Sequence, residues 1–305
     1  MQQKISKAIK QISNKVIGKN EQITLALTCL LANGHLLIED LPGMGKTTLS
    51  HALAEALGLD FSRIQFTSDL LPADMLGLNI FDSAKQSFQF HPGPIFSQLV
   101  LADEINRASP KTQSALLEAM EEQQVSLDGE TRPLPSPFFV IGTQNPMHQS
   151  GTYPLPESQL DRFLMRIQIG YPDWQAEKQM LSNPILTQAS ASEPVMSLSE
   201  FKALQHEVTQ IHASDGILNY VLKLVTHSRE QQGFPNPLSP RASKALLQAS
   251  KAWALVHARD YVIPEDIQAI LPSVAEHRMR SQMTDFYGQT SLSARLLEAI
   301  DPLAA

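Results

Sequence analysis

The fold of this chain is decided by one short stretch near its amino end, Asp40-Leu41-Pro42-Gly43-Met44-Gly45-Lys46-Thr47-Thr48. It follows the apolar run Leu36–Ile38 and leads into a helical pattern over 46–57. In a strand–loop–helix unit of this kind, backbone N–H groups turn inward around an anion, and the helix N-terminus adds its positive dipole end. The stretch therefore predicts a phosphate-binding loop; the alternative is a chance glycine turn before a helix.

The loop matches the pattern G-x-x-x-x-G-K-[ST] at its last three positions, Gly45, Lys46 and Thr47. We expect Lys46 to reach the β- and γ-phosphates and Thr47 to offer its hydroxyl to Mg²⁺. Asp40 stands where the pattern has its first glycine. Its side chain either points away from the nucleotide or repels phosphate, and the sequence leaves both open. The residues expected to line the nucleotide are Pro42, Gly43, Met44, Gly45, Lys46, Thr47 and Thr48.

A second motif has acids at the end of an apolar run, where Leu99–Ala102 is followed by Asp103 and Glu104. In open α/β sheets, ligands bind outside the carboxyl ends of the strands. In nucleotide-hydrolysing proteins with a phosphate loop, an aspartate at this place holds Mg²⁺. A neighbouring glutamate can polarise the attacking water. A solvated turn is the alternative interpretation for an isolated motif, and the phosphate loop makes it the weaker one.

Short apolar runs alternate with helical patterns up to about residue 172, which predicts an α/β domain with a mostly parallel five-stranded sheet. The expected strands are 35–38, 63–66, 99–102, 138–141 and 166–169, and the expected helices are 46–57 and 110–121. Two hairpin inserts are expected, one over 76–90 and one near 125–135 around the turn Asp128-Gly129. From residue 173 the pattern is helical, with helices expected over 174–181, 200–212, 217–230, 240–258 and 264–270 and a loop over 183–197. We therefore predict a nucleotide-binding domain over 1–172 and an all-α lid domain over 173–305.

Composition narrows the classes of protein that remain. The chain of 305 residues carries 24 basic and 31 acidic side chains, a net charge of −7, which disfavours a general binder of nucleic acid. Its single cysteine excludes an internal disulfide and a multi-cysteine zinc site. The amino end has no apolar signal segment, and the most apolar stretch, 23–38, is too polar to span a bilayer. These features predict a cytoplasmic protein.

The chain resembles the MoxR family of AAA+ ATPases from about Val16 to the last helices. The strings that carry the resemblance are Glu39-Asp40-Leu41-Pro42-Gly43-Met44-Gly45-Lys46-Thr47, Ala102-Asp103-Glu104-Ile105-Asn106-Arg107-Ala108, Gly142-Thr143-Gln144-Asn145-Pro146, Leu160-Asp161-Arg162-Phe163 and Ser239-Pro240-Arg241-Ala242. Asp40 resembles a variant that this family tolerates. The resemblance implies ATP or ADP as ligand and Mg²⁺ as cofactor.

The resemblance also assigns roles to single residues. Asn145 would be the sensor-1 residue that holds the attacking water or the γ-phosphate, although Asn-Pro alone is typical of a turn. Arg162 would be the arginine finger that reaches a neighbouring subunit's nucleotide; the residue alone favours a surface ion pair. Arg241, in the first turn of a helix capped by Ser239, would be the sensor-2 residue through which the lid closes on the nucleotide. Ile17 and Gly18 would contact the adenine through their backbone.

These roles imply a ring, expected to be a hexamer, that remodels a protein client during maturation, activation or metal-cofactor insertion. By analogy with such ATPases, a partner with a von Willebrand factor A domain is expected, and neither nucleic acid nor a membrane is. Two alternatives stay open. One is a DNA-translocating or chelatase-type motor, which shares the same inserts. The other is a nucleotide-gated switch with little hydrolysis, which Asp40 suggests.

Overall fold

A computed structural model describes residues 2–145, 152–182, 193–280 and 291–302. Its centre is a parallel five-stranded sheet in the order β2-β5-β8-β1-β9. The strands are β1 (Leu36–Glu39), β2 (Phe61–Gln65), β5 (Leu99–Asp103), β8 (Phe139–Gln144) and β9 (Met165–Ile167). The predicted α/β fold with a five-stranded parallel sheet is confirmed, with strand ends shifted by up to a few residues.

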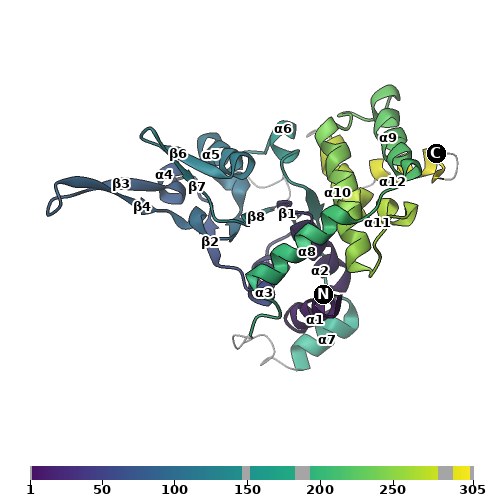
Figure 1. Ribbon diagram of the computed structural model, residues 1–305, viewed down its shortest axis with the longest axis horizontal. Helices are drawn as coiled ribbons and strands as arrows, with labels where there is room; N and C mark the ends of the chain where they lie inside the picture. Colours follow the sequence, from purple (N-terminus) through teal and green to yellow (C-terminus); the bar gives the residue numbers. More distant parts are fainter. Residues whose placement is uncertain (1, 146–151, 183–192, 281–290, 303–305) are drawn as a thin grey trace.

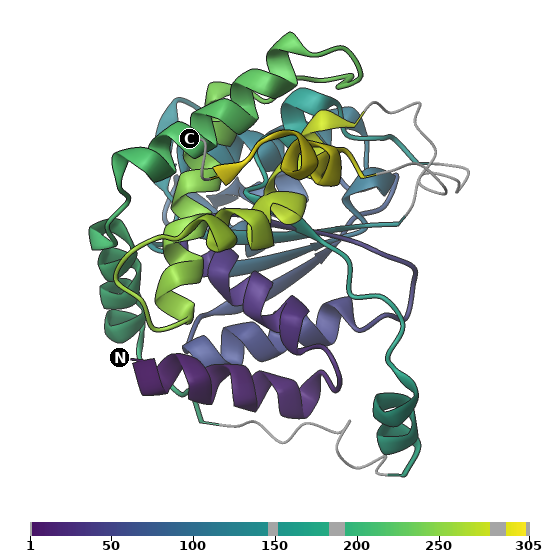
Figure 2. The ribbon, with the colours of Figure 1, turned by 90° about the vertical axis from the view of Figure 1, so that its right-hand side faces the viewer.

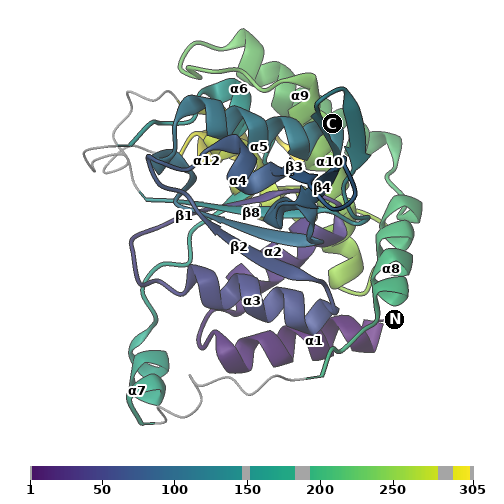
Figure 3. The ribbon, with the colours of Figure 1, turned by 90° about the vertical axis from the view of Figure 1, so that its left-hand side faces the viewer.

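Helices cover both faces of this sheet, which explains why its strands are apolar without alternation (Figure 3). One face packs on α1 (Gln2–Lys15), α2 (Asn20–Leu31) and α3 (Lys46–Leu57) through inward side chains such as Leu36 and Ile38. The other face packs on α5 (Pro110–Glu122) through side chains such as Leu37 and Val100. Helices α3 and α5 match the sequence prediction closely.

The region after residue 172 is helical, as predicted. Its helices are α7 (Trp174–Ser182), α8 (Leu198–Gln210), α9 (Asp215–Glu230), α10 (Pro240–Val256), α11 (Pro264–Met279) and α12 (Leu292–Ala299). Figure 2 shows α7 set apart from the other helices of this region. The buried side chains of α8, α10 and α11 join those of α1–α3 in one hydrophobic cluster. The boundary at 172 stays a prediction, since this core continues across it. Most of the predicted loop over 183–197 lies outside the described residues.

Four of the longer helices differ from the sequence expectation. Helices α1 and α12 were not predicted, and neither was α2, which is buried on most sides and so lacks an amphipathic stripe. Helix α11 was expected to end at Ile270 but runs on through Pro272 to Met279. The buried side chains Val274 and Met279 of this extension outweigh the cost of a proline inside a helix. The extension carries Arg278, a residue that is important below.

Both predicted inserts form hairpins. Strands β3 (Gly77–Asp82) and β4 (Ser87–Pro92) pair antiparallel and reach away from the body of the molecule (Figure 1). Strands β6 (Gln124–Leu127) and β7 (Glu130–Pro133) form the second hairpin. The remaining short elements are α4 (Pro72–Leu76), α6 (Glu157–Leu160) and two 3-10 turns, η1 (Pro94–Phe96) and η2 (Ile105–Arg107). Within the described ranges, no helix is long and apolar enough to cross a membrane.

Candidate nucleotide site

The predicted phosphate loop joins β1 to α3 with the backbone geometry that such a loop needs. Gly43 and Gly45 have φ of +83° and +87°, a region that side chains with a Cβ rarely adopt. Lys46 Nζ donates to Asp40 O at 2.5 Å and to Asn145 Oδ1 at 3.0 Å. Burial lowers the pKa of Lys46, and the charges of Asp40, Asp103 and Glu104 oppose that shift. The ammonium is thus held at the loop by two oxygens that a phosphate could replace.

The Asp40 carboxylate does not point into the loop. Its Oδ1 accepts a hydrogen bond from Leu41 N at 2.8 Å, and its Oδ2 accepts one from Gly170 N at 2.6 Å. Gly170 follows β9, so Asp40 ties the loop to the chain beyond the edge strand. Of the two orientations that the sequence left open, the structure has the one that avoids repulsion of phosphate.

We expect Asp40→Ala to destabilise the fold without strengthening ATP binding. Loss of two hydrogen bonds to a charged group should lower the free energy of unfolding by about 1–3 kcal/mol, measured by urea denaturation. The control is Asp60→Ala, because Asp60 is exposed and its hydrogen bonds to other described residues are made by its backbone. Tighter ATP binding by Asp40→Ala in calorimetry would contradict the orientation described above.

A cavity of about 310 Å³ lies beside the loop, within the size range of small-molecule pockets. Its lining includes Ile17, Gly43, Met44, Gly45 and Thr48, together with Gly170, Pro172 and Met180. Gly18 lies next to this cavity at φ +74°, and a Cβ on it would come within 2.6 Å of Ala176 Cβ in α7. The structure thus brings the predicted adenine-side residues and the loop together, whereas Pro42 of the loop is exposed and is not part of the lining.

Asp103 ends β5 at the same edge of the sheet. Its Oδ1 accepts a hydrogen bond from Thr143 Oγ1 at 2.6 Å, and its Oδ2 accepts two from Arg63, from Nη2 at 2.6 Å and from Nε at 3.2 Å. Neither Arg63 nor Thr143 was predicted as a site residue from the sequence. The polar positions Arg63 and Gln65, two apart on β2 beside the acidic strand, were the signal that could have found this side of the site.

Glu104 follows with φ 58° and ψ 47°, a left-handed backbone that is strained for a residue with a side chain. Its Oε1 accepts from Asn145 Nδ2 at 3.0 Å, and its Oε2 accepts from Gln65 Nε2 at 3.0 Å and pairs with Arg107 Nε at 3.1 Å. Asn145 therefore bridges Glu104 and Lys46. Three donors hold this carboxylate at the edge where the loop lies.

The donor set at this edge fits Mg²⁺. That ion keeps several waters and binds through one or two carboxylates plus phosphate oxygens rather than through an all-protein cage. Asp103 supplies a buried carboxylate, and Thr47 supplies a hydroxyl in the first turn of α3. Among the described residues, no cluster of three or more histidine, cysteine or acidic ligands offers a site of the cage type. The ion would neutralise phosphate charge at this place.

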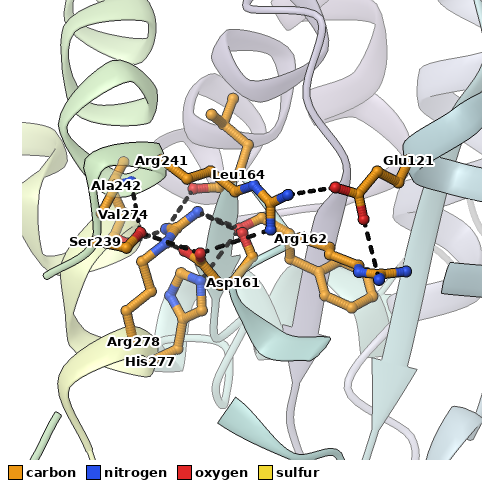
Figure 4. A network of polar contacts seen from close by, with 11 residues as sticks. Glu121, Asp161, Arg162, Leu164, Ser239, Arg241, Ala242, Val274, His277 and Arg278 are labelled. Atoms are coloured by element: carbon orange, nitrogen blue, oxygen red, sulfur yellow. Dashed lines mark hydrogen bonds and ion pairs between the residues drawn. The ribbon is translucent and has the colours of Figure 1, made fainter. Parts of the chain in front are cut away.

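Arg162 and Arg241 lie together, but away from the phosphate loop, at the other end of the strands (Figure 4). Arg162 Nη2 is 3.0 Å from Glu121 Oε2, and Arg241 Nη2 pairs with Glu121 Oε1. Arg241 Nη1 also lies 3.7 Å from Asp161 Oδ2. Glu121 was not predicted from the sequence, because its place beside the arginines is set only by where α5 ends.

Because the strands are parallel, their amino ends lie on one side of the sheet, and the arginine cluster lies there, opposite the phosphate loop. Leu164 N donates to His35 O at 2.8 Å, and His35 Nε2 lies 3.2 Å from Met120 O, so the arginine cluster sits where β1 and β9 begin. The loop leaves β1 at its other end, roughly 16 Å away at about 3.3 Å per residue. In this structure Arg241 therefore pairs with Glu121 and Asp161 and lies away from the phosphate loop of its own chain, and its predicted role at a nucleotide stays a prediction. Arg241 lies there because the start of α10 packs at the amino ends of the strands.

These features define a nucleotide-binding protein with a phosphate loop, an acidic pair on a neighbouring strand and a helical region after the sheet. Residues 35–165 match the model of the ATPase family associated with various cellular activities (AAA), and residues 227–295 match the AAA lid domain. The chain belongs to the MoxR family of AAA+ ATPases.

Three similar proteins support that assignment. Protein YeaC of Bacillus subtilis is 49% identical over 280 residues, which are 90% of this chain and 86% of that one. Chaperone MoxR1 of Mycobacterium tuberculosis is 39% identical over 284 residues, which are 90% of this chain and 75% of that one. A candidate ATPase from Cytophaga hutchinsonii has a crystal structure that superposes with a TM-score of 0.88 at 34% identity, covering 98% of this chain and 95% of that one.

Proposed function

We propose that this chain binds and hydrolyses Mg-ATP as one subunit of a cytoplasmic ring, expected to be a hexamer. The observation that carries the proposal is that the predicted site residues form two groups, which lie at opposite ends of the strands of one sheet. Lys46, Asp103 and Glu104 meet at the carboxyl ends of the strands, whereas Arg162 and Arg241 meet at the amino ends. The two halves complete one site only when the arginine edge of one subunit meets the loop edge of the next.

Head-to-tail contact of this kind is heterologous, and it generates a ring when the rotation closes. In that ring Glu104 is the general base for the attacking water, and Asn145 holds the water or the γ-phosphate beside it. Lys46, Thr47 and Asp103 bind the phosphates and Mg²⁺. Arg162 and Arg241 of the next subunit neutralise the charge that develops on the transferred phosphoryl oxygens. The sensor-2 role of Arg241 is thus proposed in trans.

For the use of this turnover we propose remodelling of a protein client, in line with the name of the relative Chaperone MoxR1. The outward hairpin β3–β4 supports it with a group of exposed apolar side chains: Leu78, Ile80, Phe81 and Phe88. Such a group on a protruding element is typical of a surface that contacts another protein. Maturation, activation or metal-cofactor insertion in a complex, with a von Willebrand factor A-domain partner, is the proposed setting.

ATP turnover tests the proposal. We expect the turnover per subunit to rise with protein concentration as rings assemble, because no subunit holds a complete site.

Lys46→Ala should weaken ATP binding by about 10- to 100-fold, since it removes a charged hydrogen-bond donor worth about 1.5–3 kcal/mol. Lys244→Ala, an exposed lysine of α10, is the control. Wild-type affinity in Lys46→Ala, measured by calorimetry, would refute the assigned loop.

The structure favours neither of the two alternative functions, the nucleotide-gated switch and the DNA-translocating motor. The nucleotide-gated switch was suggested by Asp40, whose carboxylate is occupied by the N–H groups of Leu41 and Gly170. A DNA-translocating motor remains disfavoured by the net charge of −7. Salt-dependent DNA affinity together with DNA-stimulated turnover would revive it.

A further inference from the structure

The charged ends of Arg162 and Arg241 meet on one carboxylate, that of Glu121. Glu121 stands at the end of α5 and takes one guanidinium on each of its two oxygens, Arg162 on Oε2 and Arg241 on Oε1. The three side chains are 37%, 28% and 47% exposed, so the group lies at the surface of the subunit. The two arginines come from elements about 80 residues apart along the chain, and Glu121 joins their charged ends.

The backbones that carry these arginines are held separately. Arg278 of α11 is buried and donates to Asp161 Oδ1 at 2.7 Å and to the carbonyl oxygens of Phe163 and Leu164 at 2.7 and 3.1 Å (Figure 4). Ser239 caps α10 by accepting from Ala242 N and donates its own hydroxyl proton to Asp161 Oδ2 at 3.1 Å. Asp161 therefore locks the start of α10 to the turn that carries Arg162. Only the flexible ends of the two arginines depend on Glu121.

Without this carboxylate the two guanidinium groups would not stay together. Like charges a few ångströms apart repel, and each arginine side chain gains rotamer entropy when it is released. With Glu121 in place the cluster still keeps a positive charge, because three guanidinium groups face two carboxylates. Arg162 Nε is buried without a hydrogen-bond partner among the described residues. The pair is thus converged and remains able to accept an anion.

We propose that Glu121 is a positioning residue that converges Arg162 and Arg241 for the γ-phosphate held by the neighbouring subunit. It acts through the two arginines and does not touch the nucleotide. A carboxylate that orients a catalytic cation in advance lowers the cost of reaching the geometry of the transition state. This inference rests on the proposed function, because it requires both arginines to act in trans.

The test compares Glu121→Gln with Glu122→Gln. The control residue is the next one in α5, is exposed, and makes no ion pair with any residue in the described parts of the chain. We expect Glu121→Gln to lower kcat for ATP about tenfold, since misplacement of a catalytic group by about 1 Å can cost up to 10²-fold. Its ATP dissociation constant should equal that of the wild type, which also shows that the loop half is folded. Glu122→Gln should match the wild type in both.

Mixed rings separate an effect of Glu121 on the neighbouring subunit's site from a defect in the subunit's own nucleotide site. In a mixture of Glu121→Gln and Lys46→Ala subunits, some interfaces pair an intact loop with an intact arginine pair. Turnover of that mixture should exceed the turnover of either variant alone. A defect confined to the Glu121→Gln subunit's own nucleotide site would not be rescued in this way, because that subunit supplies the intact loop.

A parallel mixture of Arg162→Ala with Lys46→Ala shows which idea fails. If this mixture recovers and the Glu121→Gln mixture does not, the positioning role is refuted and the trans arrangement stands. Wild-type or faster turnover of Glu121→Gln refutes the positioning role too; faster turnover would mean that the carboxylate competes with phosphate. If the Arg162→Ala mixture itself fails to recover, the trans arrangement falls, and the role of Glu121 falls with it.

Discussion

Replacing Arg162 by alanine is expected to reduce ATP turnover of the assembled protein by about 10³-fold or more, while ATP binding by the single subunit stays intact. Guanidinium groups stabilise the charge on the phosphoryl oxygens chiefly in the transition state, so their loss lowers kcat. The loop of the same chain lies at the opposite edge of the sheet from Arg162, which separates binding from turnover. Steady-state turnover and calorimetric ATP binding measure the two effects.

Arg162→Lys should recover little of the activity. Lysine keeps the charge but lacks the planar fork of donors that spans two phosphate oxygens. Lys244→Ala, which removes an exposed cation on α10, controls for net charge. If Arg162→Ala turned over ATP at the wild-type rate in the assembled ring, Arg162 would be an ordinary surface ion-pair partner of Glu121. A surface ion pair is what the residue alone favours.

Replacing Glu104 by glutamine is expected to slow ATP turnover by about 10²- to 10⁴-fold, the range of general-base catalysis. Glutamine keeps the shape of the side chain, and one of its ends can still accept hydrogen bonds from Asn145 or Gln65, but it cannot take a proton from water. ATP binding should persist, since Lys46 and the loop backbone do not depend on that carboxylate. The variant should therefore hold ATP in an assembled ring.

Single-turnover hydrolysis measures this effect, and Glu118→Gln on the exposed side of α5 is the matched control. Equal rates for the wild type and Glu104→Gln, even at concentrations that assemble the ring, would replace the motor by a nucleotide-gated switch. If hydrolysis is slowed as expected, clients that co-purify with Glu104→Gln in ATP would be informative, because the trapped ring should release them slowly.

The features that the sequence predicted well are local ones. The loop over 40–48 needs its glycines, its lysine and the strand and helix on either side, and all of these are neighbours in the chain. The N-cap residues Ser109 and Ser239 predict the starts of α5 and α10, because each hydroxyl accepts a hydrogen bond from the backbone N–H three residues further along the chain. The buried strands were readable from short apolar runs. Each of these signals depends on residues within one element or its ends.

The missed features depend on contacts between distant elements. Helix α11 continues past Pro272 because its last turn is buried against the turn before β9, and Arg278 is held there by carbonyl groups more than 110 residues away in sequence. Arg63 meets Asp103 only because β2 and β5 are neighbours in the sheet. No periodicity in the sequence contains that information.

The sequence by itself determined the family, the parallel sheet and the loop expected to bind phosphate, because their pattern lies within single strand–loop–helix units. Only the tertiary structure decided the direction of Asp40 and the edge at which Arg241 lies. Both depend on where α10, α11 and β9 pack against the start and end of β1. That packing places the loop and the arginine pair, with Glu121 between the arginines, at opposite ends of the same strands.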